Sequence, residues 1–277
     1  MASSSAPTRH GRDLPPPFGR IVCGVDGSRG AHVAVDQAIA LSGPGTTLIF
    51  VCVREESGSG AMRQATITAK RADEAIHEAV LAAREACVEA AGEVLTGDDR
   101  RELLLDEASR SDLLVVASHV GSRAGGIALG DTASLAVHRA GVPVLVARRP
   151  PNGPFPSRIL VATDGSEDAR RAIVLAARIA HRHEAELYLL TAPPTPAGDP
   201  SRTARDALEL AAELGVEPTV IRTSGTPAEE ILLAAAAEGV SLVVLGSRGL
   251  TGARALGSVS ERVAHRAPCS VLVARPA

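Results

Sequence analysis

The sequence predicts an α/β protein built from two tandem, doubly wound domains, each a five-stranded parallel sheet with helices on both faces. One observation is an internal duplication: "RIVCGVDGS" at 20–28 returns as "RILVATDGS" at 158–166, and "HRAGVPVLVAR" at 138–148 returns as "HRAPCSVLVAR" at 265–275. A second is that short apolar runs alternate with Ala-rich segments of helical period, which indicates a parallel sheet joined by helices. A third is that runs such as "LLVVA" and "LVVLG" are continuously aliphatic, as doubly buried strands are.

The 277 residues divide into four segments. Residues 1–18 have no apolar core segment, so we expect a disordered tail there. The two copies occupy 19–149 and 157–277. The segment 150–156 between them lies within "RRPPNGPFPS", whose prolines predict a semi-rigid linker.

The elements of the second copy follow from its alternating pattern. The apolar runs predict strands at 157–163, 185–191, 217–222, 241–246 and 269–275, and the segments of helical period predict helices at 166–183, 201–215, 226–238 and 257–266. We expect Ser166 to cap the first of these helices, with Glu167 and Asp168 at its positive end, and Pro227 to begin the third. The first copy has the same order, with a long helix expected at 64–91.

Composition excludes several classes of function. The net charge is −3, with 29 basic against 32 acidic residues, so no basic surplus favours nucleic acid or a membrane surface. Aromatic residues make up 1% of the chain, which removes the usual platforms for stacked bases. The four cysteines form no C-x-x-C pair, and the first residues contain no secretory signal pattern. We therefore expect reduced thiols and a cytoplasmic protein.

Two loops in each copy are expected to meet at the carboxyl ends of the strands, where such sheets bind ligands. One follows the first strand, with "VDGS" at 25–28 and "TDGS" at 163–166. The other, in the second copy, runs from Gly246 to Ser260 and ends at a predicted helix start. Its glycines let a ligand approach main-chain N–H groups, and Arg248 adds a positive charge. On these grounds alone, a phosphate site and a purely structural turn both remain open, because no lysine-containing P-loop is present.

The chain resembles the universal stress protein family in its tandem-domain form. The residues that carry the resemblance are "VDGS" and "TDGS", "GSRGLTGARALGSVSERVAHRAPCSVLV" in the second copy and "LGDTASLAVHRAGVPVLV" in the first. The resemblance implies a Rossmann-like fold of the adenine nucleotide alpha hydrolase-like type, dimeric packing, bound ATP, and a regulatory role in stress or dormancy. From the residues themselves, we expect the hydroxyls of Ser258 and Ser260 to add donors for phosphate and to help ligate a Mg²⁺ ion carried by the phosphates.

The resemblance also assigns residues to the nucleotide. The phosphates would be held by Gly246, Gly249, Gly257 and Ser258, with Val259 and Ser260 alongside. Thr163 and Asp164 would lie near the adenine and ribose, and Ala192 would floor the adenine pocket. The weaker counterparts in the first copy are Val25, Asp26, Val53, Gly121 and Gly130.

Both copies depart from the family's G-x-x-G, nine residues, G-[ST] pattern. In the second copy seven residues separate Gly249 from Gly257, which shortens the loop but keeps its phosphate-proximal ends. In the first copy Ser118 is expected at the place of the first glycine, eight residues separate Gly121 from Gly130, and Asp131 replaces the serine. A carboxylate there repels phosphate. We therefore expect nucleotide in the second copy and a degenerate loop in the first.

Other polar residues have simpler explanations. Asp26 and Asp164 fit a side-chain turn as well as a nucleotide contact. His138 and His265 precede the last strands and favour packing or capping. His181 and His183 suit the negative end of a helix, so no metal site is expected. The last strands would lie at sheet edges, where Val144–Val146 can pair with Val271–Val273 to give an intramolecular pseudo-dimer, with a homodimer as a further step.

Three functional hypotheses follow. The first is an ATP-binding regulatory protein without catalytic residues, acting on an unidentified protein partner. The second is a nucleotide-free scaffold that acts through partner contacts alone. The third is an enzyme that adenylylates a substrate, which is the weakest because "TDGS" is too short for a pyrophosphate loop. The sequence leaves open whether AMP or a cyclic nucleotide replaces ATP.

Overall fold

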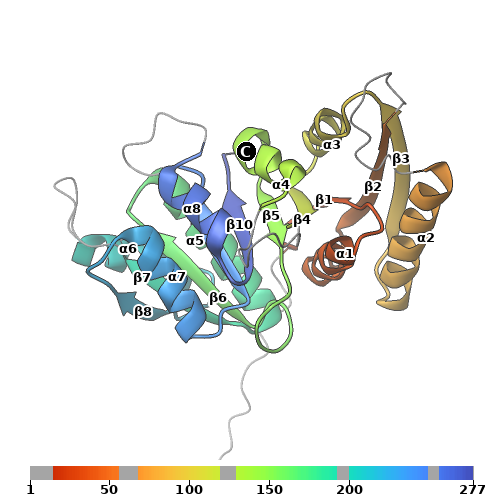
Figure 1. Ribbon diagram of the computed structural model, residues 1–277. Helices are drawn as coiled ribbons and strands as arrows, with labels where there is room; N and C mark the ends of the chain where they lie inside the picture. Colours follow the sequence, from red (N-terminus) through yellow and green to blue (C-terminus); the bar gives the residue numbers. More distant parts are fainter. Residues whose placement is uncertain (1–14, 56–67, 119–128, 192–199, 249–255, 277) are drawn as a thin grey trace, which may run out of the picture.

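The computed structural model describes residues 15–55, 68–118, 129–191, 200–248 and 256–276. Within them, each half of the chain contributes five strands and four helices in alternation (Figure 1). The first half contains β1 (Arg20–Gly24), α1 (Arg29–Leu41), β2 (Thr47–Glu55), α2 (Ala69–Glu85), β3 (Ala90–Gly97), α3 (Arg100–Ala108), β4 (Leu113–Ala117), α4 (Asp131–Arg139) and β5 (Val144–Ala147). The second contains β6 (Arg158–Thr163), α5 (Glu167–His183), β7 (Glu186–Thr191), α6 (Pro200–Glu213), β8 (Thr219–Arg222), α7 (Pro227–Ala237), β9 (Leu242–Gly246), α8 (Ser258–Arg266) and β10 (Ser270–Ala274).

All ten of these strands form one continuous sheet in the order β3-β2-β1-β4-β5-β10-β9-β6-β7-β8. Figure 1 shows it running from β8 at one end of the molecule to β3 at the other. Pairing within each half is parallel, whereas β5 and β10 are antiparallel, with Val146 opposite Val271 and Val144 opposite Val273. The predicted pairing of the two last strands is confirmed, so the halves are joined edge to edge inside one molecule.

Helices cover both faces of this sheet. One core cluster packs α1, α2, α5 and α6 against the sheet, and the other packs α3, α4, α7 and α8 against the opposite face. Both clusters extend across the two halves. The predicted doubly wound fold is therefore confirmed, and the tandem copies share a single pair of hydrophobic cores.

Two arginines, the buried Arg148 and the half-buried Arg275, reinforce the junction between the halves. Arg148 follows β5 and donates to the main-chain carbonyls of Ala264 and Cys269 in the second half. Arg275, at the same place after β10, donates to the carbonyl of Val137 on α4. Ala264 and Val137 lie in the last turns of α8 and α4, where carbonyls lack helical partners and positive charge is favourable. Each half thus caps the last helix of the other.

The long helix expected in the first half is corrected by the structure. The helix expected at 64–91 ends at Glu85, and Ala90 and Ala91 belong to β3, where they pair with Leu48 and Ile49. Alanine favours helix by propensity, but here the pairing with β2 outweighs it. The chain reverses at Cys87, whose φ is 59°.

The last residues of the expected tail make contacts in the structure. Phe18 is buried in the core, and Arg178 on α5 donates to the carbonyls of Pro15 and Pro16 at 3.2 and 2.8 Å. Residues 16–18 are therefore packed, because the apolar ring of Phe18 adds to the core and α5 supplies a hydrogen-bond donor to the prolines. The rest of the expected tail, residues 1–14, lies outside the described residues.

Candidate functional site

The two loops singled out in the second half meet where strand order reverses, between β6 and its neighbour β9. The hydroxyl of Ser166, at the start of α5, lies 3.4 Å from the carbonyl of Arg248, which follows β9. Ser166 also caps α5 as predicted, because its Oγ accepts from the N–H of Ala169 at 3.2 Å. The candidate site is therefore assembled from the β6–α5 connection, the end of β9 and the start of α8.

The "TDGS" connection is a tight turn held by its own side chains. The N–H of Ser166 donates to Oδ1 of Asp164 at 2.9 Å, and the N–H of Gly165 donates to Oγ1 of Thr163 at 3.2 Å. In the first half the N–H of Ser28 donates to Oδ1 of Asp26 at 2.9 Å. The turn-forming role of both aspartates is thus seen, and Thr163 itself is buried.

Gly246 ends β9 directly against the first turn of α5. A Cβ on Gly246 would lie 2.7 Å from the carbonyl carbon of Asp168 and 2.8 Å from the nitrogen of Ala169. Helix α5 can therefore come this close to the strand only because residue 246 has no side chain. Strand pairing gives Ala117 as the first-half counterpart, since Ala117 pairs with Ala147 as Gly246 pairs with Ala274. The expectation that Ser118 occupies this place is wrong by one residue.

Asp168 is the centre of the polar contacts here. The hydroxyl of Ser247 donates to its Oδ2 at 2.7 Å, and the main-chain N–H and Nε of Arg248 donate to the same oxygen at 3.1 and 3.2 Å. Arg171 donates to the other oxygen at 2.8 Å. Burial acts to raise the pKa of this carboxyl, but the hydrogen bonds and positive charges outweigh it and lower the pKa below its ordinary value. Asp168 is therefore a buried anion, and both of its carboxylate oxygens accept hydrogen bonds.

The start of α8 is tied to the same cluster. The N–H of Gly257 donates to the carbonyl of Ser247 at 2.7 Å, and the hydroxyl of Ser260 donates to the carbonyl of Gly246 at 2.7 Å. Ser260 is buried, Val259 is half-buried and Ser258 is exposed. Gly257 is the N-cap, and no side-chain cap bond is found at this helix start among the described residues. The structure thus brings together Thr163, Asp164, Gly246, Arg248, Gly257 and Ser260.

The first-half counterparts are less complete. Val25 donates its N–H to the carbonyl of Val51 at 2.9 Å, and Val53 lies inside β2 with its side chain buried. Gly130 is the N-cap of α4, as Gly257 is of α8, and the exposed Asp131 follows it. The remaining predicted residues, Ala192, Gly249 and Gly121, lie outside the described residues.

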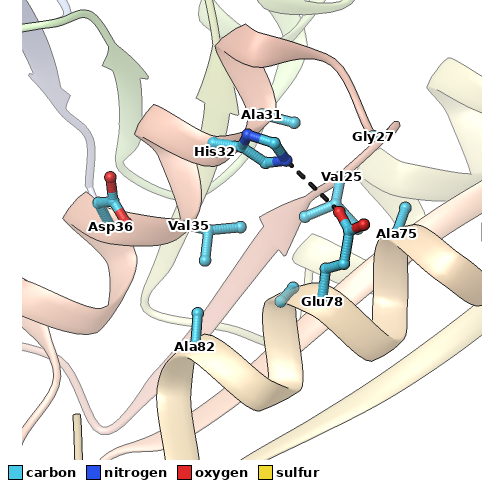
Figure 2. A pocket seen from close by; sticks show the side chains of 10 residues that line it. Val25, Gly27, Ala31, His32, Val35, Asp36, Ala75, Glu78 and Ala82 are labelled. Atoms are coloured by element: carbon cyan, nitrogen blue, oxygen red, sulfur yellow. Dashed lines mark ion pairs between the residues drawn. The ribbon is translucent and has the colours of Figure 1, made fainter. Parts of the chain in front are cut away.

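A separate cavity of about 270 Å³ lies between α1 and α2 of the first half (Figure 2). Most of its lining residues are small and apolar, among them Val35 and Ala79. His32 and Glu78 face each other across it, with 3.5 Å between Nε2 and Oε2. Val25 is the one predicted site residue in its lining, so this cavity is not the cluster around Asp168.

Sequence reasoning missed Asp168 and Ser247. Asp168 was expected only to complement the positive end of α5, and nothing in its spacing identifies a partner about 80 residues away. The usable signal was indirect: a glycine at the end of β9 permits close approach of α5, which brings a first-turn carboxylate within reach of the next residues. No helix among the described residues is long and apolar enough to cross a membrane.

The comparisons with known proteins agree with this architecture. The model of the universal stress protein family matches residues 17–148 and again 156–275. Universal stress protein YxiE of Bacillus subtilis is 34% identical over 146 residues, which cover 43% of this chain and 99% of that protein. A universal stress protein of Thermus aquaticus is 38% identical over 133 residues, 42% of this chain and 97% of its own.

Solved structures extend the likeness to both halves. The universal stress protein from Archaeoglobus fulgidus matches with a TM-score of 0.71 at 23% identity, covering 93% of this chain and 98% of its own. At that identity the match concerns the fold. Since the family model matches twice and accounts for nearly the whole chain, the chain belongs to the universal stress protein family, in a form with two such domains in tandem.

Proposed function

We propose that the second half binds ATP, and that the chain is a regulatory protein of stress response or dormancy with little or no turnover. The observation that supports this best is the start of α8. A helix with a glycine N-cap and no side-chain cap bond begins beside the ends of β6 and β9, where doubly wound sheets hold their ligands. The N–H groups of its first turn and its dipole favour a polyphosphate.

In this proposal Gly257, Ser258 and Val259 face the phosphates, and Thr163 and Asp164 lie toward the adenine and ribose. Ser260 supports the cradle from beneath, because its hydroxyl is already donated to Gly246. Magnesium would arrive on the phosphates, and the exposed hydroxyl of Ser258 is a ligand it accepts. Ala192 and Gly249 complete the proposed site from outside the described residues.

Little turnover is proposed because the nearest buried carboxylate is a poor base. Asp168 accepts from Ser247, Arg248 and Arg171, and its lowered pKa makes it reluctant to take a proton. ATP would then act by favouring one conformation of a surface that a cytoplasmic protein partner, or a second chain, reads. That requires only a difference in affinity between two states.

The first half is proposed to bind nucleotide weakly or not at all. Asp131 places a carboxylate at the first position of α4, where the second half has Ser258. Two negative charges a few ångströms apart repel by about 4 kcal/mol at an effective dielectric near 20. The second candidate function, a nucleotide-free scaffold, is favoured by the loop that is two residues short of the family pattern.

The test is calorimetric titration of the full chain with ATP and Mg²⁺, with phosphate release followed in parallel. Gly257→Val should abolish binding while the fold survives, because Gly257 has φ −75° and ψ 151°, which valine adopts readily, and the branched side chain would fill the cradle. Gly130→Val, at φ −68° and ψ 161°, is the matched control in the first half and should bind as the unaltered chain does.

Three results would contradict the proposal. Absence of binding to the unaltered chain at millimolar ATP would favour the scaffold. Equal loss from Gly257→Val and Gly130→Val would place the nucleotide elsewhere. Rapid phosphate release would contradict a regulator without turnover.

A further inference from the structure

We propose that Asp168 is a positioning residue of the second-half site: it holds Ser247 and Arg248 so that the start of α8 is presented to the polyphosphate in one arrangement. This inference rests on the proposed function and goes beyond it, because Asp168 belongs to a different helix and is not among the residues expected to touch the nucleotide. It is argued from contacts that involve three elements, α5, β9 and α8.

The first step is that Asp168 fixes the residues that leave β9. One carboxylate oxygen accepts from the hydroxyl of Ser247 and from two N–H groups of Arg248, at 2.7, 3.1 and 3.2 Å. Asp168 and Ser247 are both buried, so the bond between them is shielded from water, whereas the two bonds from Arg248 are partly buried. Hydrogen bonds to a buried charge are stronger than those between neutral groups. The main-chain bond to Arg248 sets the direction in which the chain departs.

The second step is that Ser247 connects Asp168 to the start of α8. Ser247 uses its side chain toward Asp168 and its carbonyl toward the N–H of Gly257, at 2.7 Å in both cases. Gly257 is the N-cap whose neighbours are proposed to face the phosphates. A single residue, Ser247, therefore connects the buried carboxylate to the proposed cradle, and movement of Asp168 would be passed to Gly257 through two bonds.

The third step concerns charge. Arg248 is partly exposed, and its Nε donates to Asp168. Part of its positive charge is therefore offset within the protein, so the cradle depends mainly on main-chain N–H groups. The first half has Gly30 at the place of Asp168, since each lies two residues after the capping serine of its helix. It therefore has no carboxylate at this position of its helix.

The experiment compares Asp168→Asn with Glu167→Gln in the full chain, at a temperature where both are folded. Glu167 lies in the same turn but is exposed and pairs only with Arg170 and Arg171 in the contacts described. Loss of two or three charged hydrogen bonds should weaken ATP binding by about ten- to a hundredfold in Asp168→Asn. Glu167→Gln should change it less than about twofold.

A merely structural role would lower the melting temperature without changing affinity below it, and that result would overturn the proposal. So would tighter binding by Asp168→Asn, which would mean that Asp168 only withholds Arg248 from the phosphates. Asp168→Asn made in an Arg248→Ala background should still weaken binding, because the connection through Ser247 remains. No further weakening in that background would also overturn the proposal.

A readout without nucleotide separates this inference from the proposed function. Amide hydrogen exchange at Arg248 and Gly257 should accelerate at least about tenfold in Asp168→Asn and stay unchanged in Glu167→Gln. If the unaltered chain does not bind ATP, the proposed function fails, and the exchange result alone decides whether Asp168 orders this loop. Unchanged exchange at both amides would overturn the positioning role.

Discussion

In the first half a glycine on helix α1, Gly30, faces an alanine on strand β4, whereas in the second half the glycine is on the strand and the side chain is on the helix. A Cβ on Gly30 would lie 3.3 Å from the Cβ of Ala117. A Cβ on Gly246 would lie 2.7 Å from main-chain atoms of α5. The two copies thus have their glycine on opposite sides of the same helix–strand contact.

This difference decides whether the helix provides a side chain that can bind the residues following the strand. With the glycine on the strand, α5 carries a carboxylate, and Asp168 binds the two residues that follow β9. In the first half the glycine is on the helix, so α1 has no side chain at Gly30, the position that corresponds to Asp168. The exchange of one glycine across a packed contact therefore decides whether a helix carboxylate binds the residues that follow the strand, even though the strands and their order are alike.

The largest effect expected from breaking this comparison is that of Gly246→Ala. The new methyl group would meet the main chain of Asp168 and Ala169, which cannot move without shifting α5, so we expect a loss of about 3 kcal/mol in the free energy of unfolding. Urea unfolding followed by circular dichroism measures it.

The matched change in the first half is Ala117→Gly. It removes a methyl group from a contact that already tolerates one, and we expect a loss of only about 1 kcal/mol. Equal losses at the two positions would show that the helices approach their strands equally closely and would remove the basis of the comparison.

A smaller effect is expected at the junction of the halves. Arg148→Ala would leave the carbonyls of Ala264 and Cys269 without their donor, and we expect a loss of about 2 kcal/mol in the free energy of unfolding. Part of the penalty is offset because a buried charge is removed: burial lowers the pKa of Arg148 to about 10.

Arg275→Ala should cost less than Arg148→Ala, because Arg275 is less buried. Differential scanning calorimetry of the two variants compares them directly. If Arg275→Ala proved the more destabilising, the junction would depend mainly on the hydrogen bond from Arg275 of the second half to Val137 of the first.

The fold was largely predictable because its signals are local and repeated. The aliphatic runs predicted all five second-half strands to within two residues at each end, and the apolar edge strands predicted that Val144–Val146 pairs with Val271–Val273. The structure adds that this pairing is antiparallel. The helix expected at 64–91 was too long because alanines in β3 have helical propensity and pair only with a distant strand. Local patterns do not contain that information.

The candidate site was predictable only in part. The glycines and serines at the start of α8 could be placed by motif and helix position. Asp168 could not, because its partners follow a strand far along the sequence. Ser260 was expected to offer a donor to phosphate, whereas its hydroxyl bonds to Gly246. Side-chain direction within a helix turn depends on the packing beneath it, which the sequence pattern does not specify.

The smallest expected effect is the pH dependence of stability that Asp168 gives to the second half. The pKa of Asp168 is lowered in the folded chain, so its charge stabilises the fold above its unfolded value, about 3.9, and this contribution disappears as pH falls through the lower folded value. Asp168→Asn lacks the contribution at every pH. The gap in free energy of unfolding between the unaltered chain and Asp168→Asn should therefore narrow as the pH falls from 6 to 2.5. Urea unfolding at the two pH values measures the gap. A gap that stays constant would mean that the hydrogen bonds of Asp168, rather than its charge, supply its stabilisation. The first half, with Gly30 at the matching place, has no counterpart to this acid dependence.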